Sequence, residues 1–298
     1  IIPVLDIPLA DASLLPTYIV SKLARQHMKV VLDGDGSDEL LGGYGTFQAY
    51  ELAEKLSWIP KNMISGASAL VNAALPVSHE YFSFDFKIKA FLRGMVYSRE
   101  RNIQVWLGAF TEQELKSLLK KSDSSLRGVF DVVDSVVSST ISDSFDRASL
   151  YHTQAYMNRD ILVKIDRATM AVGLEARTPF LDTDLAEFVL RLPSSYKRNK
   201  RILRELMQDR LPSVVLSRKK QGFGIPISSW FAGDLLGFVE ETLSEQNITT
   251  VGIFEYSYIK KLIYEHKNKQ YDHRKKLYTL VMFQLWYEHW VQGRMMYT

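Results

Sequence analysis

An acidic, glycine-rich segment after a short apolar run constrains the fold of this chain more than any other feature. Residues 33–44 read Asp-Gly-Asp-Gly-Ser-Asp-Glu-Leu-Leu-Gly-Gly-Tyr and directly follow Val30–Leu32. Aspartate oxygens are hard ligands that suit Mg²⁺, and glycines free backbone N–H groups to face an anion. Placed between a predicted buried strand and a predicted helix, the segment indicates a site for Mg²⁺ and a polyphosphate.

Two other structures can contain an acidic segment of this kind. A calcium-binding EF-hand loop also alternates Asp, but it requires Gly at its sixth position and Glu at its twelfth. Counting from Asp33, these positions hold Asp38 and Tyr44, which excludes the EF-hand. An ordinary polar turn, with Ser37 or Asp38 capping the next helix, stays open because Asp and Gly are also frequent in turns.

Length and composition limit the class of protein. The 298 residues, 46% of them hydrophobic, are enough for one large domain or two. A net charge of +3 is too small to indicate a nucleic-acid or anionic-membrane partner. The absence of cysteine excludes disulfides, thiolate metal sites and a Cys nucleophile, and it fits a reducing, cytoplasmic location. No apolar run reaches the roughly 18–20 residues of a membrane span, and the first residues do not resemble a signal peptide.

Apolar periodicity predicts a mainly helical chain with little sheet. The first helix is expected over residues 14–28, a buried strand over residues 29–32, and a helix from Glu39 onward. Further helices are predicted over residues 48–57, 85–97, 111–121, 125–142, 145–173, 182–191, 200–210, 233–245, 255–267 and 272–292. Since one strand cannot form a stable sheet, we expect further strands, either unrecognised in this chain or contributed from upstream.

Pro60 and the region Gly66–Pro76 are predicted to separate two parts of the chain. Residues 1–60 would form a partial nucleotide-binding α/β unit, and residues 61–298 a mainly helical body. The sequence starts at Ile1 without an initiator Met, and we expect it to begin within a longer protein.

A second candidate segment, residues 160–182, places charged side chains among apolar residues with helical spacing. Lys164 and Arg167 are three positions apart and therefore share one helix face. Two cations on one face can clamp phosphate oxygens, and Arg can do so through two parallel hydrogen bonds. Intrahelical ion pairs are the simpler alternative. Because these charges alternate with apolar residues, several are expected to be partly buried, which favours phosphate binding since a buried charge needs a partner.

Two basic segments follow. Residues 217–226 contain two glycines and a proline, so they are predicted to form a loop on which Lys220 is a movable phosphate ligand, or else a solvated turn. Another basic run is predicted to be mostly a solvated helix face: Lys197, Arg198, Lys200, Arg201 and Arg204. None of the six histidines has a partner at the i,i+4 spacing of a helical zinc site.

Together these segments resemble the C-terminal synthetase domain of glutamine-dependent asparagine synthetases. The resemblance runs in order along nearly the whole chain, through Asp6–Tyr18, Leu32–Tyr44, Leu162–Asp182, Lys200–Arg204 and Arg218–Pro226. The second segment is similar to the family motif Ser-Gly-(Glu or Asp)-Gly-x-Asp-Glu-x-x-Gly-Gly-Tyr, and the last to Arg-x-Lys-x-Gly-Phe-x-x-Pro. Each motif alone is weak, but five in order identify the family.

The resemblance implies an α/β fold of the ATP-pyrophosphatase (adenine nucleotide alpha hydrolase-like) class, predominantly helical in this chain with a partial parallel sheet. It also implies amide formation in two steps. The side-chain carboxylate of aspartate attacks the α-phosphorus of ATP in the presence of Mg²⁺, which gives β-aspartyl-AMP and pyrophosphate. Ammonia released from glutamine then displaces AMP and gives asparagine. Such chemistry depends mainly on positioning and on cations that offset developing negative charge.

The resemblance further implies roles for single residues. Asp38 corresponds to the ligand of Mg²⁺. Contacts with ATP are implied for neighbouring positions: Asp33, Gly34, Gly36 and Ser37. Asp35 corresponds to the acidic residue that takes part in formation and ammonolysis of the intermediate. Three cations are implied to face the reacting groups: Lys164, Arg167 and Lys220.

The sequence departs from the family pattern in several places. Ile7 stands where Glu is usual, and Asp33 stands where Ser is usual. No segment resembles the Ser-Gly-Gly-x-Asp-Ser loop that wraps the pyrophosphate, or the glutaminase domain with its N-terminal Cys. We therefore expect this chain to need an N-terminal half that supplies both, and to be inactive alone. A homodimer stays open.

Two alternative functions stay open as well. A related amidotransferase would act on another carboxylate, in a natural-product or polysaccharide pathway. Relatives that close β-lactam rings have Tyr where this chain has Asp35, so Asp35 favours transfer of ammonia. The second alternative is a non-catalytic partner domain that lacks the nucleotide loop.

Overall fold

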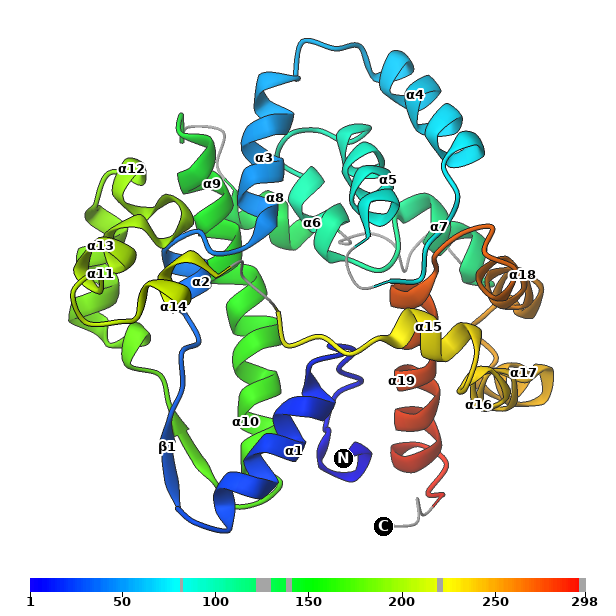
Figure 1. The fold of residues 1–298 in the computed structure, drawn as a ribbon. Helices are drawn as coiled ribbons and strands as arrows, with labels where there is room; N and C mark the ends of the chain where they lie inside the picture. Colours follow the sequence, from blue (N-terminus) through cyan, green and yellow to red (C-terminus); the bar gives the residue numbers. More distant parts are fainter. Residues whose placement is uncertain (81–82, 122–129, 138–140, 219–221, 295–298) are drawn as a thin grey trace. The chain divides into compact units, whose positions relative to one another are not determined.

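The structure is a computed structural model that describes residues 1–80, 83–121, 130–137, 141–218 and 222–294 (Figure 1). By its internal contacts the chain divides into two compact units. One, here called the helical unit, comprises Ile1–Leu15, Ile59–Asp131 and Gly224–Thr298. The other, here called the loop unit, comprises Pro16–Trp58 and Val132–Phe223. One boundary, between Trp58 and Ile59, lies beside the predicted one at residue 60. The grouping otherwise differs from the prediction, because Ile1–Leu15 belongs to the helical unit and Val132–Phe223 groups with the acidic segment.

A small parallel sheet organises the loop unit. β1 (Val30–Leu32) pairs with β2 (Glu175–Arg177), with Val30 opposite Glu175 and Leu32 opposite Arg177. The two strands run side by side in Figure 1. Sequence periodicity predicted β1 but not β2, because a three-residue strand that follows a helix is too short to show alternation. Within the described residues, the sheet consists of these two strands.

The expectation that the first strand is buried is wrong. Leu32 is 73% exposed and Val30 is 44% exposed. A single neighbouring strand and the adjacent helices leave these side chains in solvent. An apolar run of three residues signals burial only when a second layer covers it, and β1 has no such cover within the described part of the loop unit.

Short helices surround this sheet. Those that lie in or enter the loop unit are α1 (Leu14–Arg25), α2 (Ser37–Leu40), α3 (Gly45–Lys55), α8 (Asp131–Val136), α9 (Ser144–Tyr151), α10 (Leu162–Met170), α11 (Thr183–Arg191), α12 (Ser194–Lys197), α13 (Arg201–Leu206) and α14 (Ser213–Ser217). A π-helical segment, His152–Ile161, joins α9 to α10. The helix predicted over residues 145–173 is therefore present as three consecutive helical pieces.

The helix predicted from Glu39 onward is interrupted. α2 ends at Leu40, and Gly42 adopts a left-handed backbone with φ 62° before α3 begins at Gly45. A Cβ atom on Gly42 would lie 2.3 Å from Cε2 of Phe145. Both the backbone angle and the contact with α9 therefore require glycine at this turn.

The helical unit packs around its last helix, α19 (Arg274–Trp290), drawn in red in Figure 1. The elements that contact it include the 3-10 helix Ile2–Val4 and the helices α15 (Ile227–Ala232), α16 (Leu236–Thr242), α17 (Glu245–Val251) and α18 (Tyr256–Lys267). The core that these α-helices share with α19 includes Val239, Ile259 and Leu277, each at most 1% exposed. The structure confirms the predicted helices over residues 255–267 and 272–292. Their apolar side chains, spaced at helical periodicity, pack into this core.

The remaining helices of this unit are α4 (Lys61–Ala74), α5 (Phe84–Met95), α6 (Asn102–Leu107) and α7 (Glu112–Leu118). The interpretation of Gly66–Pro76 as a separating region is wrong, because most of it lies inside α4. A Cβ atom on Gly66 would meet nothing within 4 Å, so no packing requirement explains this helical glycine. No described helix offers the continuous apolar length that crossing a bilayer would take.

Candidate functional site

The acidic loop, Asp33–Asp38, connects β1 to α2 and is fixed by hydrogen bonds. The Asp33 N–H donates to the carbonyl of Arg177 at 2.9 Å, which extends the pairing of β1 with β2. The Asp35 N–H donates to Asp33 Oδ1 at 3.1 Å, and the Ser37 hydroxyl donates to the carbonyl of Gly34 at 2.7 Å. The neighbouring strand and the loop's own side chains therefore define its shape.

Gly36 brings the loop into contact with the second candidate segment. Its φ is 84°, and a Cβ atom built there would lie 2.4 Å from Cδ2 of Leu181. A side chain at this position would both strain the backbone and overlap Leu181. The two motifs that the sequence places about 130 residues apart, residues 32–44 and 162–182, thus meet in the fold, as strand pairing between β1 and β2 also shows.

The loop carboxylates suit a divalent cation. Asp33 Oδ2 is buried and has no hydrogen-bond partner among the described residues, and burial raises the pKa of Asp33. Asp38 Oδ1 lies 2.6 Å from the ammonium of Lys200, so this carboxylate already attracts a cation. Hard cations such as Mg²⁺ prefer carboxylate oxygens of this kind. The residues present therefore fit the metal that the resemblance implies.

A buried acid, Glu39, directly follows the loop in the chain. Glu39 is 1% exposed and accepts a 2.5 Å hydrogen bond from the Tyr44 hydroxyl. Burial raises the pKa of Glu39, and the negative charges of Asp38 and Asp35 raise it further. Its carbonyl also accepts a hydrogen bond from Ser149 at 3.2 Å. Glu39 and Tyr44 belong to the family motif, but sequence reasoning assigned them no role.

The basic run at residues 197–204 is mostly paired rather than solvated, which corrects the prediction. Lys197 is 2% exposed and lies 2.9 Å from Asp146. Arg198 lies 2.5 Å from Glu51. Arg201 and Arg204 are exposed, as predicted.

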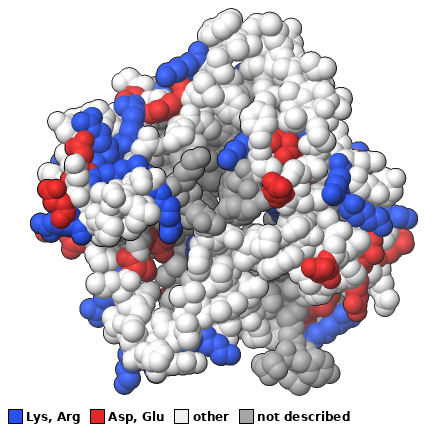
Figure 2. Space-filling model, viewed as in Figure 1, with Lys and Arg blue, Asp and Glu red and all other residues white. Residues whose placement is uncertain are grey.

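Tertiary folding produced these pairs, since helical periodicity does not reveal acidic partners elsewhere in the chain. On the face shown in Figure 2, basic side chains lie beside acidic ones and do not form one continuous basic surface.

Two of the three predicted phosphate-binding cations, Lys164 and Arg167, lie on α10. Lys164 is 7% exposed, which confirms the expected burial, and α10 packs against β2. Arg167 forms an ion pair with the adjacent Asp166, so the simpler ion-pair interpretation holds for it in this structure. Lys220 lies outside the described residues, and its role stays a prediction.

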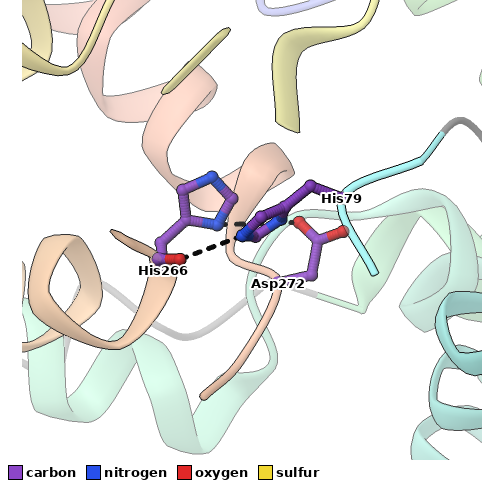
Figure 3. Close-up of side chains that lie close together, drawn as sticks. All are labelled: His79, His266 and Asp272. Atoms are coloured by element: carbon purple, nitrogen blue, oxygen red, sulfur yellow. Dashed lines mark hydrogen bonds and ion pairs between the residues drawn. The ribbon is translucent and has the colours of Figure 1, made fainter. Parts of the chain in front are cut away.

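A second polar cluster lies in the helical unit. His79, His266 and Asp272 present possible ligand atoms that all lie within 4.8 Å of one another (Figure 3). No sequence pattern indicated this cluster, because His79 and His266 are far apart in the chain and do not share a helix. Two imidazoles and a carboxylate can bind zinc when their lone pairs are free.

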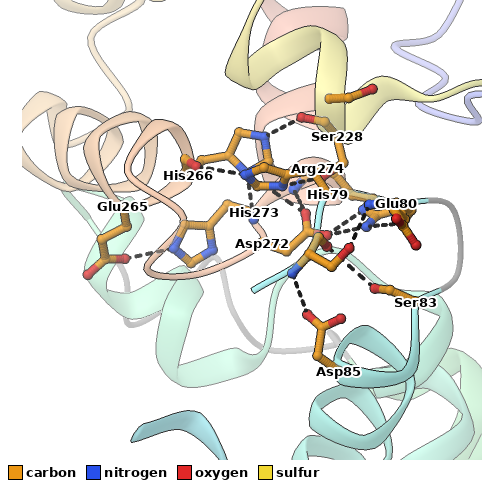
Figure 4. Close-up of polar contacts among 12 residues, drawn as sticks. His79, Glu80, Ser83, Asp85, Ser228, Glu265, His266, Asp272, His273 and Arg274 are labelled. Atoms are coloured by element: carbon orange, nitrogen blue, oxygen red, sulfur yellow. Dashed lines mark hydrogen bonds and ion pairs between the residues drawn. The ribbon is translucent and has the colours of Figure 1, made fainter. Parts of the chain in front are cut away.

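Hydrogen bonds already occupy these lone pairs (Figure 4). His79 Nε2 donates to the carbonyl of His266 at 3.1 Å, so its Nδ1 accepts from the Ser228 hydroxyl at 2.7 Å. His266 Nε2 donates to the carbonyl of Ser228 at 3.0 Å, and its Nδ1 accepts the N–H of His273 at 3.1 Å. Both rings are therefore neutral Nε2–H tautomers with no lone pair left for a metal.

The carboxylate and the surrounding burial support the same interpretation. Asp272 accepts from the backbone N–H of Arg274 at 3.0 Å and from its Nε at 2.6 Å. Burial lowers the pKa of His266 and of His273 to about 4, which keeps both rings neutral near pH 7. The cluster is a structural hydrogen-bond network that joins α15 to the segment between α18 and α19.

Comparisons with known proteins agree with the motifs. The asparagine synthase family matches residues 1–288. The chain is 31% identical to asparagine synthetase [glutamine-hydrolyzing] 1 of Bacillus subtilis (strain 168), over 98% of this chain and 45% of that protein. It is 30% identical to a putative asparagine synthetase [glutamine-hydrolyzing] of Mycobacterium bovis, over 97% of this chain and 43% of that protein.

A more distant similarity, 25% identity over 84% of this chain, is to the amidase chry2 of Gibberella zeae, 40% of which is covered. The chain spans less than half the length of each of these curated relatives. The match of the family over nearly the whole chain, together with the order of the motifs, shows that the chain belongs to the asparagine synthase family.

Proposed function

We propose that this chain forms the nucleotide-binding part of an ATP-dependent amide synthetase with an ATP-pyrophosphatase fold. In the parent activity it would convert aspartate to asparagine through β-aspartyl-AMP. The observation that supports this most is the parallel pairing of β1 with β2, which brings the acidic loop and the segment 162–182 to one end of the sheet. Ligands of open α/β sheets bind at the carboxyl ends of the strands, where this loop lies.

The loop residues divide the binding of ATP and Mg²⁺ between them. Asp38 is the proposed Mg²⁺ ligand, and Asp33, five positions earlier in the same loop, has a buried oxygen without a hydrogen-bond partner among the described residues. Contacts with ATP are assigned to residues of the turn: Asp33, Gly34, Gly36 and Ser37. When bound, Mg²⁺ would offset the negative charge that develops on the leaving pyrophosphate.

The other residues are assigned by their charge and burial. Asp35 is the proposed base that accepts a proton from the ammonia nitrogen as it bonds to the acyl carbon and AMP leaves. Lys164, nearly buried on α10, would interact strongly with phosphate because little solvent screens it. Arg167 would exchange its Asp166 partner for a phosphate oxygen, and Lys220 would stabilise the transferring phosphate.

The ammonia is proposed to come from a glutaminase half of the protein. Two observations support a further partner segment. The relatives from Bacillus subtilis and Mycobacterium bovis are glutamine-hydrolysing by name and more than twice as long as the region matched. Apolar side chains of the loop unit are also exposed, among them Leu32 at 73% and Leu23 at 61%, and additional strands would cover them.

Exchange of radiolabelled pyrophosphate into ATP tests the proposal. In the full-length protein, aspartate-dependent exchange is expected, and Asp38→Asn should lower it by about 10²–10³-fold because the cation loses its carboxylate. Asp209→Ala, an exposed aspartate of the same unit, is the matched control and should retain exchange. The 298-residue chain alone is expected to show none. Normal exchange in Asp38→Asn would contradict the metal role.

The similarity to an amidase leaves the acceptor carboxylate to be tested separately. Running the same exchange with aspartate, glutamate and larger carboxylic acids in turn shows which acid is adenylated. Exchange that depends on another acid, and not on aspartate, would assign the chain to a different amide synthetase within the family.

A further inference from the structure

Lys200 has a backbone conformation that is unusual for its residue type. Both Asn199 and Lys200 have φ 56°, in the left-handed region. Asn tolerates this region, but Lys rarely adopts it without support from its surroundings. The Lys200 N–H donates to the carbonyl of Leu41 at 2.8 Å, and Gln48 Nε2 donates to Asn199 Oδ1 at 2.8 Å. The strained turn is therefore tied to the end of α2.

This conformation directs the side chain to the acidic loop. Lys200 Nζ lies 2.6 Å from Asp38 Oδ1 and 3.0 Å from the Ser37 hydroxyl. Gly43 leaves room for the pair, because a Cβ atom there would lie 1.7 Å from Asp38 Oδ1 and 2.5 Å from Lys200 Cε. The left-handed backbone of Lys200 and the absence of a side chain at Gly43 thus both permit the contact between Lys200 and Asp38.

Ordinary stabilisation does not account for this arrangement. The Lys200–Asp38 pair is only partly buried, with side chains 25% and 23% exposed, and ion pairs near the surface contribute little to stability. The other pairs of the basic run form without a left-handed residue, as Arg198 does with Glu51. Strained conformations that persist next to a binding loop commonly serve the function of that loop. The relevant effect of the contact is therefore its effect on the position and charge of the Asp38 carboxylate.

We propose that Lys200 is a positioning residue that acts as a tethered cation at the metal site. Without a divalent cation, its ammonium holds the Asp38 carboxylate in place and offsets the like charges of Asp33 and Asp35. When a divalent cation binds Asp38, repulsion displaces the ammonium, and the flexible stem carries it toward the anionic substrate. In the absence of nucleotide, Lys200 therefore weakens binding of the metal. The inference rests on the proposed metal role of Asp38.

Binding of Mn²⁺ to the nucleotide-free, full-length protein, measured by electron paramagnetic resonance with Mg²⁺ as competitor, tests this inference. Lys200→Met removes the competing cation and should tighten Mn²⁺ binding by about 3- to 10-fold. Arg201→Met is the matched control, because it removes a neighbouring charge that pairs with Glu205 and not with the loop. This control should change the affinity by less than about 2-fold.

A second variant, Lys200→Gly, controls for misfolding of Lys200→Met. Lys200→Gly removes both the ammonium and the side chain that strains the backbone, and it should tighten Mn²⁺ binding as Lys200→Met does. Equal or weaker Mn²⁺ binding in both Lys200 variants, compared with Arg201→Met, would overturn the inference. Asp38→Asn distinguishes a failure of the proposed metal role of Asp38 from a failure of the proposed role of Lys200. If it leaves Mn²⁺ binding intact, the proposed metal role fails; if it abolishes binding while the Lys200 variants match the control, only the role of Lys200 fails.

Discussion

The acidic loop and the histidine cluster both gather titratable side chains, but their polar atoms are satisfied to different degrees. In the histidine cluster, each ring nitrogen of His79 and His266 has a hydrogen-bond partner of matching polarity. In the acidic loop, Asp33 Oδ2 is buried without a hydrogen-bond partner among the described residues, and the cation on Asp38 is held by a strained turn.

Hydrogen-bond satisfaction distinguishes a candidate ligand site from a structural cluster. A cluster of metal-ligating residue types is common in folded proteins, and complete hydrogen bonding marks it as part of the scaffold. Buried acceptors left without partners, together with backbone strain, mark a place where a ligand completes the structure. By this criterion the acidic loop is a better candidate for a ligand site than the closely spaced histidines.

Acidic pH should separate the two regions most strongly. His266 and His273 have a pKa of about 4 in the folded protein, compared with about 6.5 when unfolded. Between these values the unfolded chain binds more protons, so the stability present above about pH 6.5 is lost as the pH falls toward 4. The upper limit is about 3 kcal/mol for each histidine.

The acidic loop should respond in the opposite direction, because burial raises the pKa of Asp33 and of Glu39. Their protonation at low pH favours the folded state. Hydrogen–deuterium exchange at pH 7 and pH 5 should show protection falling in α18 and α19 while residues 33–41 keep theirs. A His266→Gln variant should show a smaller pH effect, and equal loss of protection in both regions would break the comparison.

The next largest effect is expected at Gly36. Gly36→Ala places a Cβ atom 2.4 Å from Cδ2 of Leu181 at a φ of 84°, which should cost about 2–4 kcal/mol in unfolding free energy. Chemical denaturation measures it. Gly34→Ala is the control, since a Cβ atom there meets nothing within 4 Å and should leave stability nearly unchanged. Equal destabilisation by both variants would show that contact with the second motif does not shape the loop.

The smallest effect is expected from added zinc. Because hydrogen bonds occupy the imidazole lone pairs of the histidine cluster, Zn²⁺ should not raise the melting temperature through this cluster. His79→Gln is the control: any rise in melting temperature that Zn²⁺ causes should be the same in this variant and in the wild type. A zinc-dependent rise that disappears in His79→Gln would show that the network opens to bind a metal.

Much of the molecule could be predicted from local sequence, and the failures share one cause. The helices over residues 85–97, 182–191 and 255–267 appear within a few residues of their predicted bounds, because apolar spacing and burial agree there. β2 and the pairs formed by Lys197 and Lys200 were not foreseen. Each depends on a partner distant in sequence, such as Ser37, 163 positions from Lys200.

Local sequence was sufficient to predict the acidic loop, the order of the family motifs and most of the helices, because these depend on neighbouring residues and their spacing. The tertiary structure alone decided that β1 is exposed, that Lys200 reaches Asp38, and that His79 meets His266 across 187 positions. Such contacts form only when the chain closes long loops, and their energies depend on which distant groups then lie within a few ångströms. No periodicity in the sequence encodes that proximity.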